Sequence, residues 1–340
     1  MIALNEPAGQ ENGVPLYVHV LFELTVASRA QLEPQIDSSI ALSANPASPP
    51  LETQILVGGR PTEEQLIRCP EVRAVIVPYA GVPSATQRLL TSDFPHISLH
   101  NLHHNATAAA ELAVALMLDA AKSITSVDRA FRHHDWRSRY DGSTMQLLHG
   151  KTLLLLGLGA IGTRVATICH AMGMNVMAVR RRPGRPSPGF VRVAAPEKLP
   201  SLLPGADVLC VAAPLTPKTE GLIGSKELSA MPNHAVLVNV ARGAIVDEQA
   251  LYDALRTKRI AAAGIDTWYA YPRTEPERVG TPPSRFPFWE LDNVVMSPHR
   301  GGAFGSTEME QRRMDQLAEI LNAAATGSPL PNRVDIEAGY

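Results

Sequence analysis

Three glycines, Gly157, Gly159 and Gly162, stand in the spacing G-x-G-x-x-G. A glycine at the first position permits a tight turn, one at the second lets the backbone approach a pyrophosphate, and one at the third lets a helix pack closely on its strand. Backbone N–H groups at the start of that helix attract phosphate oxygens. The pattern predicts dinucleotide binding by Gly157, Gly159, Ala160, Ile161 and Gly162.

The residues on both sides of these glycines predict the elements that must position them. Four leucines at 153–156 are typical of a strand buried on both faces. Apolar residues at helical spacing predict a helix over 160–172, and a second strand follows at 175–179. The glycine motif indicates a nucleotide site only where it follows a strand and begins a helix. This context therefore favours a nucleotide site over a merely glycine-rich turn.

Bulk composition narrows the class of protein. The 340 residues are enough for about two domains, and 45% of them are hydrophobic. A net charge of −2 gives no long-range reason to expect nucleic acid or an anionic membrane as partner. Cys69, Cys169 and Cys210 lie far apart in apolar surroundings, which favours small core residues in a reducing compartment and no metal site.

The N-terminal residues 1–13 lack the basic start and apolar run of a signal peptide. The longest apolar tract, 106–121, is interrupted by Glu111 and Asp119 and does not suit a membrane span. We therefore expect a cytoplasmic protein.

Short apolar runs and turn signals predict an α/β protein throughout. Before the glycine motif we expect strands at 17–22, 54–57, 74–77 and 96–99, helices at 62–69 and 83–90, and a long connecting helix at 107–130. After it we expect strands at 207–211, 235–240, 261–265 and 294–297, and helices at 247–257 and 308–325. Regular alternation of strands and helices predicts a parallel, doubly wound sheet.

Four further motifs carry a family resemblance. They are Asn239-Val-Ala-Arg-Gly-Ala-Ile-Val-Asp-Glu248, Asp207-Val-Leu-Cys-Val-Ala-Ala-Pro-Leu-Thr-Pro-Lys-Thr219, Gly264-Ile-Asp266 and Ser297-Pro-His299. In order and spacing, from about residue 54 to 325, the sequence resembles the D-isomer-specific 2-hydroxyacid dehydrogenases of the formate/glycerate dehydrogenase-like superfamily.

The resemblance implies a split arrangement and a homodimer formed through the nucleotide-binding domains. We predict a Rossmann-type NAD(P)-binding domain at 104–299, inserted into a smaller flavodoxin-like α/β substrate domain at 1–103 and 300–340. The expected hinges are 101–105 and 298–302.

Residue roles follow from the same resemblance. It implies that Arg242 binds the substrate carboxylate, for which a planar guanidinium is suited, and that His299 is the acid/base, a task for a group titrating near neutrality. It assigns Asp266 and His299 to the cofactor, Asp266 through the nicotinamide carboxamide. The other implied contacts are Pro214, Thr219 and Ala241 for the cofactor, and Tyr79, Ala80, Gly81 and Asn105 for the substrate.

Arg242 and His299 each have a simpler interpretation. An arginine before a glycine is most often a surface residue, and a histidine after Pro298 can be an ordinary loop residue. Both, however, follow predicted strand ends of one sheet, which is where open α/β folds bind ligands. We therefore favour the catalytic interpretation.

Tyr271 occupies a position where the family usually has a glutamate paired with the histidine. A carboxylate there would stabilise the imidazolium and raise its pKa, whereas a neutral phenol supplies far less stabilisation. We therefore expect His299, with Tyr271 beside it, to work at lower pH, unless Glu275 or Glu277 substitutes. Formate dehydrogenases also carry a neutral residue here, so a formate-like substrate is an alternative.

The end of the second strand departs from the NAD pattern. An NAD-specific fold places an Asp or Glu about 20 residues beyond the glycines, to bind the ribose hydroxyls. This sequence has Arg180, Arg181 and Arg182 instead. Guanidinium groups attract a 2′-phosphate, so we expect NADP in preference to NAD. The alternative is a solvated charge run that leads into a loop.

Together these observations predict an NAD(P)-dependent oxidoreductase that interconverts a 2-oxo acid and a D-2-hydroxy acid. A formate-dehydrogenase-like hydride transfer is one alternative. The other is a dinucleotide-sensing binding protein with little turnover, for which the family's transcriptional corepressors are the precedent.

Overall fold

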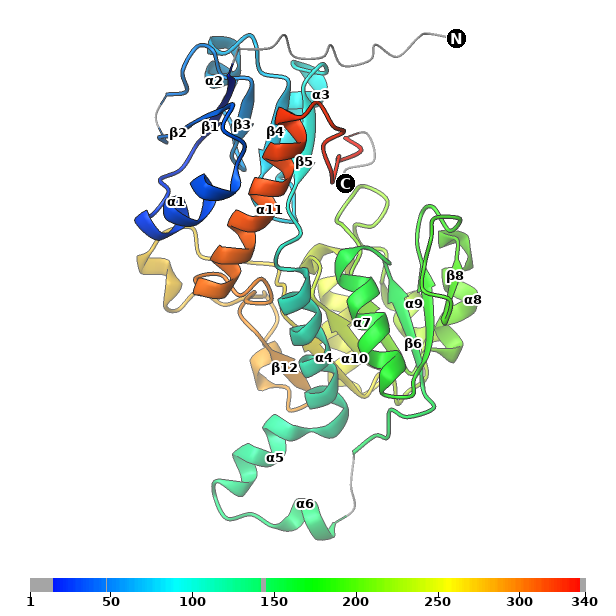
Figure 1. The fold of residues 1–340 in the computed structure, drawn as a ribbon. Helices are drawn as coiled ribbons and strands as arrows, with labels where there is room; N and C mark the ends of the chain where they lie inside the picture. Colours follow the sequence, from blue (N-terminus) through cyan, green and yellow to red (C-terminus); the bar gives the residue numbers. More distant parts are fainter. Residues whose placement is uncertain (1–14, 47, 142–144, 337–340) are drawn as a thin grey trace. The chain divides into compact units, whose positions relative to one another are not determined.

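The structure is a computed structural model that describes residues 15–46, 48–141 and 145–336. The chain divides into two compact units (Figure 1). Unit 1 comprises Met1–Asn105 and Phe304–Tyr340, and unit 2 comprises Ala106–Ala303. Unit 2 is thus inserted in unit 1, with boundaries a few residues from those expected. No helix of the described residues is long and apolar enough to cross a membrane.

Unit 1 is built on a five-stranded parallel sheet in the order β2-β1-β3-β4-β5. Buried residues alternate between its faces: Val18 and Ile55 pack toward helices α1 and α11, whereas Leu56 and Val75 pack toward α2 and α3. The strands are β1 (Leu16–Val20), β2 (Ile40–Ala44), β3 (Ile55–Val57), β4 (Ala74–Val77) and β5 (Ser98–Asn101); the helices are α1 (Val26–Leu32), α2 (Glu63–Arg68), α3 (Ser84–Ser92) and α11 (Thr307–Ala325).

Unit 2 is built on a seven-stranded parallel sheet in the order β12-β11-β10-β9-β6-β7-β8. The predicted fold class, a doubly wound parallel sheet with a second, smaller α/β unit, is confirmed. The strands are β6 (Thr152–Leu156), β7 (Asn175–Val179), β8 (Val191–Ala194), β9 (Val208–Val211), β10 (Val236–Asn239), β11 (Ala262–Ile265) and β12 (Val294–Met296).

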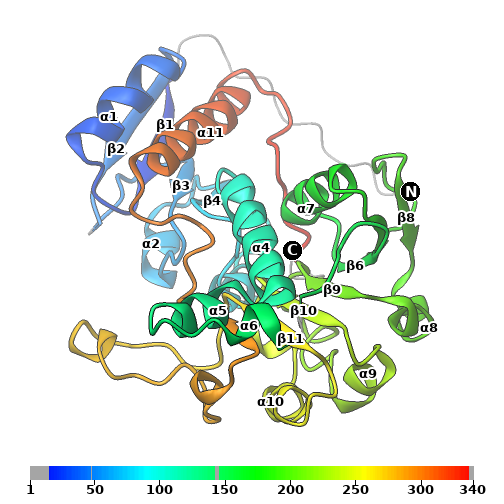
Figure 2. The same ribbon diagram turned by 90° about the horizontal axis from the view of Figure 1, so that it is seen from below.

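Helices cover both faces of this sheet (Figure 2). Of the four leucines of β6, Leu153 and Leu155 join the core under α4 and α7, and Leu154 and Leu156 join the opposite core. This is the two-sided burial expected from the leucine run. The helices are α4 (Ala106–Lys122), α7 (Ala160–Ala171), α8 (Leu199–Leu202), α9 (Ser225–Ala230) and α10 (Glu248–Arg256).

The single long helix expected at 107–130 was wrong. Helix α4 ends at Lys122 because Ser123 adopts the left-handed conformation, with φ of 55°. The Asp119 carboxylate then accepts a hydrogen bond from the backbone N–H of Thr125 at 2.8 Å and starts a new helix. Helices α5 (Ile124–Phe131) and α6 (Arg137–Tyr140) follow and extend away from the sheet of unit 2 (Figure 1).

Helix α1 and strand β2 were not predicted from the sequence. Their stability comes from distant partners: α1 packs on α11, and β2 pairs with β1 from Leu16–Ile40 to Val20–Ala44. Such long-range contacts do not appear in a local pattern.

Candidate active site

The three glycines of the motif differ in their surroundings. Gly157 adopts φ of 103°, and a Cβ there would lie 2.7 Å from the backbone nitrogen of Ala213. A Cβ on Gly162 would overlap the carbonyl oxygen of Gly157. A Cβ on Gly159, by contrast, would meet no protein atom within 4 Å. Packing within the protein therefore explains Gly157 and Gly162, whereas the position of the Gly159 Cβ is open.

Helix α7 offers the anion-binding end expected of a dinucleotide site. Its N-cap residue is Gly159, which supplies no side-chain hydrogen bond, and no acidic residue occurs in the first turn. The N–H groups there, together with the helix dipole, favour a negatively charged ligand. The residues present fit the pyrophosphate of NAD(P).

The loop after β9 lies beside the glycine motif, where Ala213 contacts Gly157. In this loop the Thr219 hydroxyl donates to the carbonyl oxygen of Pro214 at 2.7 Å and accepts from the Thr216 N–H at 2.8 Å. Two predicted cofactor residues, Pro214 and Thr219, therefore shape one turn at the end of the central strand.

The side chain of Arg180, which was predicted to bind the cofactor, is bound to its own loop. Its guanidinium donates to the carbonyl oxygens of Pro183, Arg185 and Pro186, in the loop after β7. Its Nε is buried without a hydrogen-bond partner. Arg180 thus organises the loop that follows the strand, while the neighbouring Arg181 has an exposed side chain.

Arg242 follows β10 in a tight turn. The buried Asn239 holds this turn, because its side chain donates to the Arg242 carbonyl oxygen at 3.0 Å and accepts from the Ala241 N–H at 3.1 Å. The next residue, Gly243, packs so closely on the backbone of Trp268 that a Cβ there would overlap the Trp268 carbonyl oxygen.

Asp266 follows β11 and is buried, with 1% of its surface exposed. One carboxylate oxygen accepts from the Ser297 hydroxyl at 2.5 Å and from the Arg300 N–H at 2.9 Å. The other accepts from the Gly301 N–H at 2.9 Å. In this structure the carboxylate therefore holds the loop after β12, which carries His299.

His299 lies in that loop with φ of 54°, a left-handed conformation that is rare for residues with a side chain. Desolvation by surrounding protein lowers the pKa of His299, the nearby Arg242 charge lowers it further, and Asp266 opposes these effects. Arg242, Asp266 and His299 therefore come together at the carboxyl ends of three adjacent strands.

Tyr271 lies beside His299, with 5.4 Å between ring centroids and 56° between ring planes. Its phenol oxygen accepts a hydrogen bond from the Trp268 N–H at 2.9 Å. The two glutamates considered as substitutes bind within their own loop: Glu275 pairs with Arg278 at 2.9 Å, and Glu277 accepts from the Arg273 N–H at 2.8 Å.

The remaining predicted substrate residues belong to unit 1. Tyr79 is 37% exposed and covers Gly59, where a Cβ would overlap the phenol. The carbonyl oxygen of Ala80, which precedes Gly81, accepts from the Asn101 side chain at 2.6 Å. The side-chain oxygen of Asn105 is buried without a hydrogen-bond partner among the described residues.

Trp268, which was not predicted as a site residue, lies beside the segments that carry Arg242 and His299. Its indole N–H donates to the Ser297 carbonyl oxygen at 2.8 Å, and the side chain is only 6% exposed. The available signal was its place two residues after Asp266, in a segment rich in aromatic residues.

Comparison with known proteins identifies the family of the chain. A family model described as D-isomer specific 2-hydroxyacid dehydrogenase, NAD binding domain, matches residues 114–301. The chain is 32% identical to D-3-phosphoglycerate dehydrogenase of Mycobacterium leprae over 304 residues, which cover 86% of this chain and 53% of that protein. It is 39% identical to glyoxylate reductase of Aeropyrum pernix over 235 residues, 68% of this chain and 67% of that protein.

A solved structure is also similar. A D-isomer specific 2-hydroxyacid dehydrogenase from Xanthobacter autotrophicus Py2, in complex with NADPH and MES, matches with a TM-score of 0.78 and 26% identity, covering 96% of this chain and 100% of that one. The chain spans about half the length of the phosphoglycerate dehydrogenases it matches. Because the family model covers more than half of the sequence, the chain belongs to the D-isomer specific 2-hydroxyacid dehydrogenase family.

Proposed function

We propose that this protein interconverts a 2-oxo acid and a D-2-hydroxy acid, with Arg242 as the carboxylate anchor and His299 as the acid/base. The observation that carries the proposal is the convergence of Arg242, Asp266 and His299 at the carboxyl ends of β10, β11 and β12. These strands belong to the sheet whose β6 leads into the glycine motif, and ligands bind at this edge of open α/β sheets.

The proposed chemistry assigns one task to each side chain. When bound, NAD(P) accepts or supplies a hydride. The Arg242 guanidinium binds the planar carboxylate in a bidentate manner and so orients the neighbouring carbonyl group. In the reductive direction His299, in its imidazolium form, donates a proton from its ring to the carbonyl oxygen; in the oxidative direction the neutral ring accepts that proton from the hydroxyl group.

We infer that NADP is preferred over NAD. Support comes from the run Arg180 to Arg182 at the end of β7, where no carboxylate repels a 2′-phosphate. We assign the phosphate contact to Arg181, whose side chain is exposed, and the shaping of the loop to Arg180, which donates to carbonyl oxygens of that loop. The similar Xanthobacter protein, which is solved with NADPH, also favours this choice.

A turnover screen tests the function. NADPH and NADH oxidation would be followed with glyoxylate, hydroxypyruvate, phenylpyruvate and longer 2-oxo acids, and formate would be tried in the oxidative direction. We expect turnover of at least one 2-oxo acid and its loss in His299→Asn. Tight NADPH binding without turnover of any of these compounds would instead favour a dinucleotide sensor.

The neutral Tyr271 beside His299 keeps a formate-like reaction as the second candidate. Formate oxidation transfers a hydride without protonating a carbonyl oxygen, so it does not need a carboxylate to support an imidazolium. In the same screen, NADP reduction by formate that survives in His299→Gln would favour this candidate.

We also propose a homodimer that forms through α5, α6 and residues 145–147. Helix α5 has no buried residue. A set of large apolar side chains is exposed over residues 124–141 and 145–147, which we call the arm of unit 2. They are Ile124, Val127, Phe131, Trp136, Tyr140, Met145 and Leu147, each 38–74% exposed. An apolar surface of this extent favours a protein partner.

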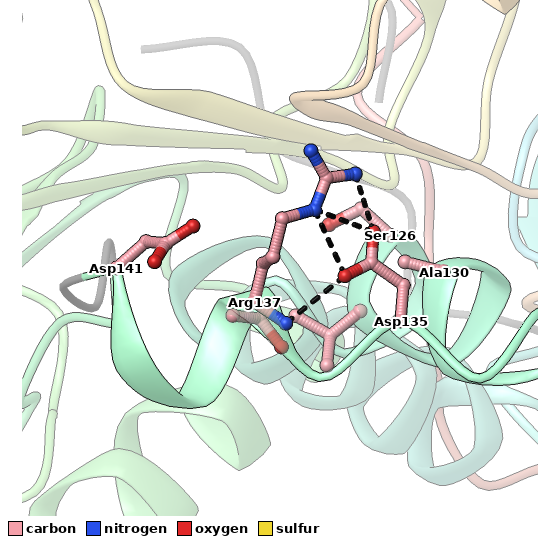
Figure 3. A pocket seen from close by; sticks show the side chains of 7 residues that line it. Ser126, Ala130, Asp135, Arg137 and Asp141 are labelled. Carbon is pink, nitrogen blue, oxygen red and sulfur yellow. Dashed lines mark hydrogen bonds and ion pairs between the residues drawn. The ribbon is translucent and has the colours of Figure 1, made fainter.

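The polar part of this arm suits a second copy of the same chain. A pocket between α5 and α6 has Asp135, Arg137 and Asp141 in its wall, and the Arg137 guanidinium points toward the Asp135 carboxylate (Figure 3). Because one surface carries apolar groups and both signs of charge, it can complement itself across a two-fold axis.

A further inference from the structure

Trp268 contacts the immediate neighbourhood of three residues of the proposed site. Its carbonyl group packs on Gly243, next to Arg242. Its backbone N–H donates to the phenol oxygen of Tyr271, and its indole N–H donates to the carbonyl oxygen of Ser297, two residues before His299. One buried residue, through its backbone and its indole, therefore joins the segments that follow β10, β11 and β12.

The loop that carries His299 needs such support. His299 holds φ of 54°, and a left-handed conformation of a residue with a side chain persists only where its surroundings enforce it. The Ser297 N–H donates to the Ile265 carbonyl oxygen at 2.8 Å, and the Ser297 carbonyl oxygen also accepts from the His299 N–H at 3.0 Å. The indole of Trp268 thus binds the same carbonyl oxygen that begins the turn at His299.

Packing makes the indole itself rigid. Trp268 is 6% exposed, and its ring meets the fully buried ring of Phe288 edge to face, with centroids 5.9 Å apart. A side chain held in this way presents its N–H in one direction, which is what a supporting residue of an active site must do.

We propose that Trp268 is a positioning residue, whose indole N–H fixes the loop of Ser297 and thereby sets where His299 stands relative to Arg242 and Tyr271. This inference rests on the function proposed for His299. The groups that face His299 are Arg242, Asp266 and Tyr271. If the loop relaxes, the imidazole moves away from the Arg242 charge and from its desolvating surroundings, so its pKa rises toward the ordinary value.

Trp268→Phe tests the proposal, because it removes the N–H donor and retains an aromatic ring against Phe288. Trp289→Phe is the matched control: the same substitution is made at a side chain that is 50% exposed. We expect Trp268→Phe to lower kcat roughly tenfold, with less than a twofold change in KM for NADPH. The control should retain the wild-type values.

The decisive measurement is the titration of the His299 imidazole by NMR, with its signal assigned from the spectrum of His299→Asn. We expect the His299 pKa, and the acidic limb of the pH–rate profile with it, to rise in Trp268→Phe and to stay unchanged in Trp289→Phe. A purely structural role of Trp268 would lower the melting temperature without moving this titration, and that result would overturn the proposal.

Two further variants separate the possible failures. If Trp268→Phe does not fold, benzothienylalanine at position 268 retains the shape of indole and replaces the N–H by sulfur; an unchanged His299 titration there overturns the inference. If His299→Asn retains full activity, the proposed function fails instead, and the titration still reports whether Trp268 positions the loop.

Discussion

The ring of Tyr271 lies 5.4 Å from the imidazole of His299, but its hydroxyl group accepts a hydrogen bond from the Trp268 backbone. Tyr271 therefore borders the histidine through its ring and brings no negative charge to it. Desolvation raises the pKa of the Tyr271 phenol, so this side chain stays neutral at physiological pH. Desolvation and the nearby Arg242 charge lower the pKa of His299 below its ordinary value, and Asp266 opposes them.

Replacing this phenol by a carboxylate should reverse that effect. In Tyr271→Glu we expect the pKa of His299 to rise by one unit or more, because an adjacent negative charge favours the imidazolium. Reduction needs the protonated ring, so its rate falls as pH rises through this pKa, and the variant should reduce its substrate up to a higher pH. The pH dependence of kcat/KM measures the shift, with Tyr271→Phe as control. Coincident profiles of wild type and Tyr271→Glu would refute the argument.

Arg242→Lys keeps the positive charge but loses the planar pair of donors. We expect kcat/KM for the 2-oxo acid to fall roughly 10- to 100-fold, the range of a hydrogen bond to a charged group. Arg242→Gln should lose more, and its His299 pKa should rise, because the neighbouring positive charge is gone. Steady-state kinetics and the pH profile of both variants provide the measurement. Arg256→Lys, on the exposed end of α10, is the control and should behave as wild type.

Arg181→Ala should weaken the discrimination between the two cofactors. We expect the ratio of kcat/KM for NADPH to that for NADH to fall roughly tenfold or more, because a guanidinium–phosphate hydrogen bond is lost. Arg180→Ala should lower the use of both cofactors, since it frees the loop at Pro183 to Pro186. Arg278→Ala, at an exposed arginine elsewhere in the sequence of unit 2, is the control. A wild-type preference for NADH would contradict the assignment.

The proposed dimer surface can be tested with charge. Phe131 and Trp136 stack edge to face, with centroids 4.8 Å apart, and are 48% and 56% exposed. The double variant with Phe131→Glu and Trp136→Glu should convert a dimer into a monomer, because dimerisation would bury both charges at an apolar interface. Sedimentation velocity measures the mass. Val279→Glu, at a residue that is 89% exposed elsewhere in unit 2, should leave it unchanged. A wild-type monomer at micromolar concentration would rule the proposal out.

Unit 1 should lose stability on acidification. Desolvation lowers the pKa of His19, His100 and His104, in the last case to about 4, helped by the Arg313 charge. These histidines bind protons near pH 6.5 in the unfolded chain, but only at lower pH in the folded unit. The stabilisation is therefore fully present above pH 6.5, and it is lost as the pH falls toward the pKa of the folded state. For His104, which is only partly buried, we expect a loss of roughly 1 kcal/mol between pH 6.5 and 5.

Urea denaturation of wild type and His104→Gln at pH 7.5 and 5 would measure this effect. The variant should show a smaller loss of the free energy of unfolding on acidification, since glutamine does not titrate. His133→Gln, at an exposed histidine of unit 2, is the control. Equal losses in wild type and His104→Gln would show that His104 does not contribute.

Local patterns in the sequence determined β6, α7 and the glycine motif between them. The leucines of β6, the glycines from Gly157 to Gly162 and the apolar spacing of α7 each reflect neighbours in the chain, so they can be interpreted without knowing the fold. The family motifs also indicated that Arg242, Asp266 and His299 follow strand ends. Parallel order then implies that they meet at one edge of a sheet.

Only the tertiary structure decided which partners these residues have. It broke the long helix at Ser123, directed Arg180 to the carbonyl groups of its own loop, and brought Trp268 to Ser297, 29 residues away in sequence. Hydrogen bonds of this kind depend on the order of strands, which places β11 beside β12, and on side-chain directions set by packing. Neither property is encoded in the spacing of residues along a single segment.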